Sequence, residues 1–165
     1  MPIYNPEILK AKSSGRKKEF KAIAQKIRKL KGREVDKIIH QYHNDEFTTI
    51  NCLECANCCK TLGPRLTHSD IERMSGYIKL PVKDFCDNYI SVDNDGDYIF
   101  NSSPCPFLQS DNYCSIYDAR PRACRTYPHT DRNNIRGIIM ICLKNTETCP
   151  VVYNIFEKLA RHGLK

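Results

Sequence analysis

Cysteine clustering is the feature that most constrains this chain. Four cysteines fall within eight residues, at Cys52, Cys55, Cys58 and Cys59, and the 165 residues hold ten in all. Thiols this close in sequence cannot pair sensibly with one another as disulfides. A Cys-x2-Cys turn instead brings two sulfurs to one side of the backbone, near the separation that tetrahedral zinc or an iron–sulfur cluster needs. The cluster therefore predicts a metal centre.

The rest of the composition indicates a reducing compartment. The first residues, 1–6, lack the apolar segment of a secretory signal, and the longest apolar run, residues 138–143, is far shorter than a bilayer span. We therefore expect a cytoplasmic protein with no transmembrane segment. Thiols stay reduced in the cytosol, so these cysteines indicate metal binding or catalysis rather than a disulfide framework.

Basic residues are concentrated near the beginning of the chain. Residues 1–33 carry eleven Lys or Arg and two acids, whereas residues 34–165 carry fifteen Lys or Arg and seventeen acids. An ordinary solvated helix face would explain such a run. The functional alternative is that basic residues 10–33 neutralise nucleic acid phosphates.

Apolar spacing predicts mostly helices in the first half of the chain. Residues 1–15 look loose, and the spacing then predicts either one helix kinked at Gly32 or a pair of helices to about Asn44. Thr67 and Asp70 form a capping-box pattern for a helix over 68–76.

The second half contains the expected strands. Residues 90–100 alternate around an acidic turn, which predicts a β-hairpin, and residues 135–142 are predicted to be a strand. Pro81 and Pro150 each open a predicted helix. The expected fold class is α+β: a small, helix-rich, loop-rich, metal-stapled domain with a short hairpin. We expect a basic N-terminal helical arm, residues 1–47, before a cysteine-cluster metal-binding domain, residues 48–165.

Most of the remaining cysteines lie beside prolines or arginines. Cys105 and Cys149 each precede a proline, which stiffens the backbone beside a sulfur. Cys149 also precedes the first turn of the last helix, where the dipole favours a thiolate. Cys86 differs because it lies within a predicted helix without such neighbours, so a structural role is favoured. The nine candidate metal ligands are Cys52, Cys55, Cys58, Cys59, Cys105, Cys114, Cys124, Cys142 and Cys149.

These nine thiols allow several metal arrangements. Two four-coordinate centres would use eight sulfurs and leave one spare. A [4Fe–4S] cluster with a zinc ion, two clusters, or one centre with structural thiols all fit. The first cluster matches the start of the bacterial ferredoxin run but lacks its continuation, so a fourth ligand comes from Cys105, Cys124 or Cys149. Cys58 and Cys59 point to opposite sides if extended, so one or both are ligands.

Other polar residues carry weaker signals. Arg120, Arg122 and Arg125 surround Cys124, and they either offset thiolate charge or are ordinary surface charges. His40 and His43 lie at i and i+3 of a predicted helix. Such a pair could bind metal, but it more often lies on a solvated helix face.

Several of these motifs, in this order, resemble the YkgJ-type cysteine-cluster (CxxCxxCC) family. They are Cys52-x2-Cys55-x2-Cys58-Cys59, Cys105-Pro106-Phe107-Leu108, Cys114-x-Ile116-Tyr117 and Arg120-Pro121-x2-Cys124-Arg125. The resemblance spans about 50–150. It implies zinc or iron chelation in a bacterial, cytosolic protein. Many members have three residues before the cysteine pair, where this chain has two, and members are often labelled Fe–S oxidoreductases.

Three functions are therefore expected. The first is a cysteine-ligated metal-binding protein, with an iron–sulfur cluster or zinc in one or two centres and with redox activity as an Fe–S oxidoreductase. The second is a non-catalytic zinc module that binds RNA or a protein partner through the basic arm. The third is a metal-dependent enzyme that modifies a protein or peptide, which the resemblance implies through a flagellin lysine methylase in the family.

Overall fold

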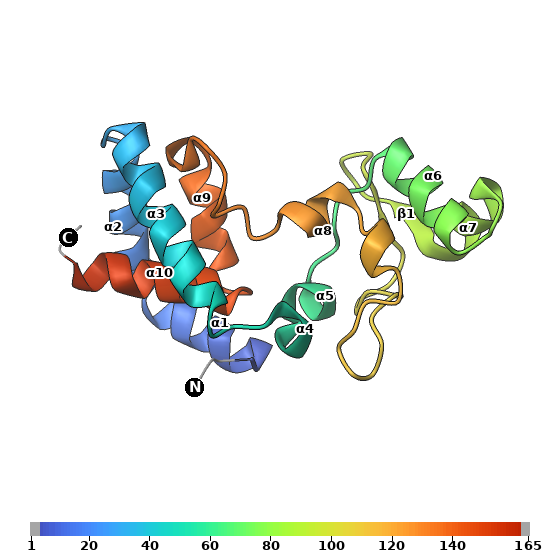
Figure 1. Cartoon of the computed structure of the whole chain (residues 1–165), viewed down its shortest axis with the longest axis horizontal. Helices are drawn as coiled ribbons and strands as arrows, with labels where there is room; N and C mark the ends of the chain where they lie inside the picture. Colours follow the sequence, from blue (N-terminus) through green and yellow to red (C-terminus); the bar gives the residue numbers. More distant parts are fainter. Residues whose placement is uncertain (1–3, 163–165) are drawn as a thin grey trace. The chain divides into compact units, whose positions relative to one another are not determined.

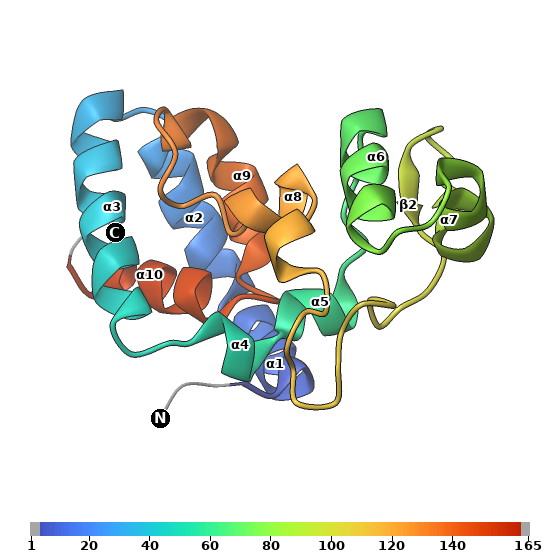
Figure 2. The same cartoon turned by 45° about the vertical axis from the view of Figure 1, so that its right-hand side comes forward.

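The computed structural model describes residues 4–162, and the chain forms two compact units. The first unit comprises the residues up to 57 and those from 128 onward, and the second comprises residues 58–127. Figures 1 and 2 show helices throughout and one small sheet. The expected α+β class is confirmed: the chain is mainly helical with a two-stranded antiparallel hairpin. The predicted division at residue 47 stays a prediction.

The first unit begins with a helix where the sequence predicts a loose segment. Helix α1 spans Pro6–Gly15. The Asn5 side chain accepts hydrogen bonds from the backbone N–H groups of Glu7 and Ile8, both at 3.0 Å, and Pro6 occupies the first turn. This is a favourable start for a helix. The expectation of a loose segment is therefore wrong for residues 6–15, since Asn5 caps the helix and Pro6 fits its first turn, while residues 1–3 lie outside the described residues.

Four further long helices lie in the first unit. They are α2 (Lys17–Ile27), α3 (Gly32–Phe47), α9 (Ile135–Asn145) and α10 (Pro150–Arg161). Helices α2 and α3 are separate, so the helical pair is the correct alternative. Helices α2, α3 and α9 each pack against α10. The predicted amphipathic helix at Pro150 is confirmed as α10.

The core of this unit forms around an aromatic group between α2 and α10. The Phe20 ring lies 5.6 Å from the Tyr153 ring and 5.3 Å from the Phe156 ring, centroid to centroid. Phe20 is fully buried, and burying a side chain of this size contributes about 1.5–3 kcal/mol to folding. The apolar stripe of α2 thus packs inward and leaves its lysines at the surface.

Residues 135–142 are helical, so the predicted strand is wrong. In α9, Ile135, Ile139 and Cys142 are buried at intervals of four and three residues, which is helical periodicity. Met140 and Ile141 are exposed. The β-branched run has intrinsic strand preference, but a buried face at helical spacing outweighs that preference.

The loop before α9 is fastened to α3 by side chains. His43 Nδ1 lies 2.7 Å from Thr130 Oγ1, and His40 Nε2 donates to the Arg132 carbonyl at 2.9 Å. The Asp36 carboxylate accepts from the N–H groups of Asn134 and Ile135 at 2.8 and 2.9 Å. The two half-buried histidines therefore hold this loop against α3.

The short helices α4 (Cys52–Cys55) and α5 (Asn57–Thr61) occupy the cysteine cluster. Asn51 caps α4 by accepting from the Leu53 N–H at 3.0 Å. Ala56 follows with a φ of 49°, a left-handed conformation that ends the helix. The backbone therefore turns sharply between the two pairs of cysteines.

The second unit contains the elements predicted for it. Helix α6 spans His68–Tyr77 and α7 spans Val82–Tyr89, and strands β1 (Ile90–Val92) and β2 (Tyr98–Phe100) form the hairpin. A 3-10 helix, η1 (Tyr117–Ala119), and α8 (Arg122–Thr126) follow. The hairpin and the two helices confirm the sequence predictions. Its buried core is Leu66, Ile71, Met74, Phe85, Phe100, Phe107, Ile116 and Ala119.

A buried carboxylate connects three segments of the second unit. Asp70 accepts from Thr67 in the predicted capping box and from Arg73 at 2.6 Å. It also accepts from the N–H of Arg122 at 3.0 Å. Burial alone would raise the Asp70 pKa, but these hydrogen bonds outweigh it and lower the pKa to about 2. Asp70 thus ties the start of α6 to the start of α8.

Replacing Asp70 by Asn should destabilise the second unit. The depressed pKa corresponds to about 2 kcal/mol of unfolding free energy, which is present above the unfolded pKa near 4 and is lost as the pH falls towards 2. Urea unfolding of D70N at pH 7 should show about that loss, and the difference from the parent should shrink between about pH 4 and pH 2. Exposed Asp87→Asn is the matched control. A loss of unfolding free energy in D70N that does not depend on pH would show that it does not arise from the ionised Asp70 carboxylate.

The described part of the chain contains no membrane-spanning helix, because none of its helices combines sufficient length with sufficient apolar character.

Candidate metal centre

All ten cysteines lie in the described part of the chain, and each is a free thiol. They divide between the units. The first unit holds Cys52, Cys55, Cys142 and Cys149, and the second holds Cys58, Cys59, Cys86, Cys105, Cys114 and Cys124. The unit boundary, between residues 57 and 58, therefore runs through the four-cysteine cluster.

Backbone hydrogen bonds bring three cysteine segments of the second unit together. The Cys105 N–H donates to the Cys59 carbonyl at 2.8 Å. The Cys105 carbonyl accepts from the Leu108 N–H at 3.1 Å, and Leu108 forms an antiparallel bridge with Cys114. Cys59, Cys105 and Cys114 are therefore adjacent in space although they are up to 55 residues apart in sequence.

The fourth segment carries Cys124 and Arg120. Cys124 lies in α8, whose start is held by the bond from the Arg122 N–H to Asp70. The Arg120 guanidinium lies 3.4 Å from the centre of the Tyr117 ring, and its Nε donates to the Tyr117 carbonyl at 2.7 Å. The start of this segment is thus fixed at several points, since the Arg120 carbonyl also accepts from Arg73 at 2.8 Å.

The thiols of the second unit interact electrostatically. A hydrogen bond from Cys58, whose sulfur is 3.9 Å away, lowers the Cys59 pKa to about 7. Arg120 and Lys60 lower that pKa further, and burial opposes the shift. Cys59 is therefore the most acidic thiol of this group and carries substantial thiolate at neutral pH.

The pKa values of the three other thiols of this group, Cys105, Cys114 and Cys124, are raised rather than lowered. Burial raises the pKa of Cys105 to about 11 and that of Cys124 to about 12, and it also raises the pKa of Cys114. Proximity to Cys59 raises all three further. Arg120 lowers the pKa of Cys114 and Cys124. Without a cation these thiols hold their protons, and a bound metal would replace them.

Arg120 is the arginine that acts on this group. Its charge lowers the pKa of Cys59, Cys114 and Cys124. Arg122 and Arg125 are exposed and do not contribute to these shifts. All three arginines look equivalent in the sequence, and only the stacking on Tyr117 distinguishes Arg120.

Three cysteines share one local hydrogen-bond pattern. The Cys105 sulfur accepts backbone hydrogen bonds from Phe107 and Leu108, and the Cys114 sulfur accepts one from Ile116. The Cys149 sulfur accepts from Val151 and Val152 at the start of α10. N–H groups aimed at sulfur stabilise its anionic form, which is the form that binds metal. The sequence indicates this arrangement at Cys149, because a predicted helix begins there. It gives no such sign at Cys105 or Cys114.

The first unit brings together a smaller group. Cys149 is buried at the N-cap of α10, and burial raises its pKa to about 12. Nearby Cys52 and Cys55, the two ends of α4, raise that pKa further. These three cysteines form a second group of thiols, distinct from that of the second unit.

Two cysteines lie apart from both groups. Cys142 is buried in α9, and burial raises its pKa to about 11 without a contribution from another thiol of the described chain. Its assignment as a ligand stays a prediction. Cys86 packs against the core of the second unit, in keeping with the structural role expected for it.

The donor chemistry fits zinc or iron, while the side chains are not drawn fully together. Within residues 4–162, no three His, Cys, Asp or Glu side chains already converge closely enough to hold an ion. The backbone contacts and the sulfur-directed N–H groups nonetheless bring thiolate donors, the preferred ligands of these metals, into two neighbourhoods.

Comparison with known proteins supports this chemistry. Residues 51–150 match the CxxCxxCC family, whose description is "Putative zinc- or iron-chelating domain". The chain belongs to this family. The match covers both groups of thiols but begins after the basic helices.

One curated relative also matches. It is called uncharacterized protein MJ0661, from Methanocaldococcus jannaschii, and is 30% identical over 83 residues, which are 48% of this chain and 44% of that protein. The chain therefore spans less than half the length of this relative. No solved structure matches.

In metal-free protein, Cys59 should be the fastest thiol of its group to react with iodoacetamide at pH 7. A pKa near 7 leaves about half of Cys59 as thiolate, against a few per cent for an ordinary cysteine. Cys58→Ala removes the hydrogen bond and should slow Cys59 alkylation by about fivefold, as followed by peptide mass spectrometry. Cys86→Ala is the control. Unchanged Cys59 reactivity in C58A would show that Cys58 does not set its acidity.

Proposed function

We propose that this protein binds zinc or iron through two groups of thiolates, one in each unit. The observation that carries the proposal is the gathering of Cys59, Cys105, Cys114 and Cys124 from four separate segments beside one arginine. Burial makes ionisation of Cys105, Cys114 and Cys124 unfavourable in the absence of a cation, and a bound cation removes that penalty. Membership of the CxxCxxCC family supports metal as the cation.

The second unit offers a complete ligand set. Four cysteines match the number that a structural zinc ion or a [4Fe–4S] cluster takes from its protein. Four thiolates around Zn²⁺ leave a net charge of about −2, which Arg120 partly offsets. Cys58 then serves as a hydrogen-bond donor to the Cys59 sulfur rather than as a ligand.

The first unit offers an incomplete set. Cys52, Cys55 and Cys149 supply three donors, which leaves one position for Cys142, water or a substrate. Three protein ligands with one open position are typical of catalytic rather than structural zinc. If the bound metal is an iron–sulfur cluster with redox activity, the open position in the first unit is where a substrate would reach it. Such a redox protein would act in the cytoplasm.

Metal content should separate into two parts. Protein isolated without oxygen should hold about two zinc ions, or iron with acid-labile sulfide and broad absorbance in the blue. C105S and C124S should each remove the metal of the second unit, and C149S that of the first, as measured by elemental analysis and the absorption spectrum.

Matched variants make this result specific. Cys86→Ser and Cys58→Ser should retain the full metal content. Loss of all metal from every single variant would indicate one shared centre, and full content in C105S and C124S would refute the ligand set of the second unit. Zinc without iron or sulfide after anaerobic isolation would refute the redox function while leaving metal binding intact.

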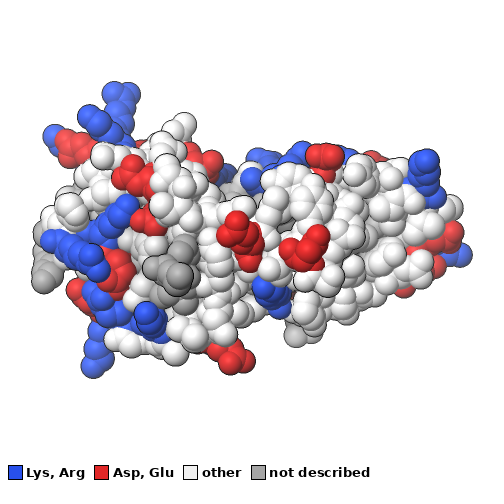
Figure 3. Space-filling model, turned by 60° about the horizontal axis from the view of Figure 1, so that its bottom comes forward, with Lys and Arg blue, Asp and Glu red and all other residues white. Residues whose placement is uncertain are grey.

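A basic surface supports RNA binding as a second function. The apolar face of α2 is buried, so its exposed lysines are held in fixed positions on a packed helix. The exposed basic residues of this stretch are Lys17, Lys18, Lys21, Lys26, Arg28, Lys29, Lys31 and Arg33. Figure 3 shows one face of the molecule, on which Lys and Arg side chains are interspersed with acids. The spacing and number of these charges suit phosphates better than a shaped protein surface.

RNA affinity should fall steeply with salt. A variant with Lys17, Lys21, Lys26 and Lys29 replaced by Gln should bind a single-stranded RNA more weakly, and its log–log salt slope should be shallower by about 3. Fluorescence anisotropy between 50 and 200 mM salt (roughly the range in which such contacts are released) would measure both. Four replacements elsewhere, at Lys60, Lys79, Lys83 and Lys144, are the control. Equal effects of the two variants would exclude a site on α2.

A further inference from the structure

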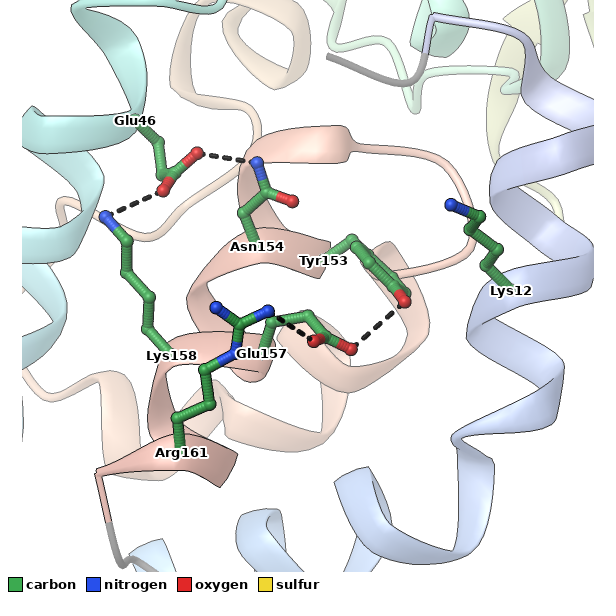
Figure 4. Close-up of a pocket in the computed structure, with 7 residues that line it drawn as sticks. All are labelled: Lys12, Glu46, Tyr153, Asn154, Glu157, Lys158 and Arg161. Atoms are coloured by element: carbon green, nitrogen blue, oxygen red, sulfur yellow. Dashed lines mark hydrogen bonds and ion pairs between the residues drawn. The ribbon is translucent and has the colours of Figure 1, made fainter. Parts of the chain in front are cut away.

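A hollow in the first unit lies outside both groups of thiols. It has a volume of about 320 Å³ and lies where α10 meets the ends of α1 and α3 (Figure 4). This volume is at the lower end of the range for small-molecule sites. Its walls are polar and charged, and none of the residues that line it is a cysteine.

The two carboxylates of the hollow are already engaged. Glu46 is buried, and it accepts from Lys158 and from the Asn154 amide, each at 2.7 Å. Glu157 accepts from the Tyr153 hydroxyl at 3.1 Å and pairs with Arg16. Both negative charges thus have near partners, so a cationic ligand would find no free carboxylate.

Two cations of the hollow are left with unused donors. Lys12 reaches towards it from α1 and makes no hydrogen bond or ion pair with another residue of the described chain (Figure 4). The Arg161 side chain is 77% exposed and contacts Glu157 at 3.6 Å, which leaves most of its N–H groups unused. A guanidinium and an ammonium at opposite sides of a small hollow suit a carboxylate.

One acceptor completes the set. The Asn154 amide nitrogen donates to Glu46, so its carbonyl oxygen is not used in that hydrogen bond. Figure 4 shows this oxygen turned away from Glu46. The lining has a formal charge of +1, from Lys12, Lys158 and Arg161 against Glu46 and Glu157. The site thus combines donors for an anion with an acceptor for a neutral hydrogen-bond donor.

We propose that this hollow binds a small organic carboxylate that also carries a hydroxyl group. Lys12 and Arg161 hold the carboxylate, and the Asn154 carbonyl accepts from the hydroxyl. Glu46 holds Asn154 in place, and Glu157 pairs with Arg161. The residues that line the hollow share no side chain with the two groups of thiols.

Calorimetric titration of the 165-residue protein, with its metals retained and at constant ionic strength, tests this site with L-malate and succinate. These two dicarboxylates differ by one hydroxyl. We expect saturable malate binding at millimolar concentrations, about tenfold tighter than succinate binding. Lys12→Gln with Arg161→Gln should weaken malate binding by at least about tenfold. Lys37→Gln with Lys144→Gln removes two exposed charges of the same unit away from the hollow and should leave malate binding unchanged.

Each other outcome overturns part or all of the proposal. Absence of saturable malate binding, or equal weakening in both double variants, would refute the site. Equal affinity for malate and succinate would refute the acceptor role of Asn154. Tighter binding of inorganic phosphate than of malate would refute a carboxylate ligand. All four replaced side chains lie at the surface, so both double variants should fold like the parent. Circular dichroism checks this.

Discussion

The carboxylate of Asp70 is the interaction on which the second unit depends. It is buried, yet its hydrogen bonds to Thr67, Arg73 and the Arg122 backbone keep it ionised. Those bonds fix the segment that contains Arg120 and Cys124. The core of the second unit has only eight buried side chains, so a satisfied polar anchor of this kind adds to what apolar burial supplies. The position of the segment that carries Cys124 therefore derives from an ion pair made by α6, which carries no cysteine.

Local signals made much of this fold predictable. The Thr67–Asp70 capping box, the acidic turn of the hairpin and the proline at the start of α10 each act within a few residues, so the sequence shows them directly. Helix α9 was not predictable in this way. Its isoleucines favour a strand locally, and only packing against α2, α3 and α10 selects the helix. Helix α1 was missed because its proline, its two serines and its glycine suggested a loop.

The grouping of the cysteines could not be predicted from spacing. Proximity of Cys59 to Cys105 and Cys114 results from hydrogen bonds between segments about 50 residues apart, and sequence distance conceals them. The same holds for the histidine pair, whose partners lie about 90 residues away in the loop before α9. The residue types correctly indicated metal chemistry, which family membership supports, but their partners depend on tertiary structure.

The boundary at residues 57 and 58 has an evolutionary consequence. Residues 56 and 57 join cysteines that belong to different compact units, so they need not maintain a fixed distance between two ligands of one ion. Ala56 and Asn57 are both buried, so an extra residue there requires local repacking of the turn, while the cysteines inside each unit keep their own spacing. A longer connector in a relative is therefore compatible with the same coordination chemistry inside each unit, wherever this turn is repacked to hold it.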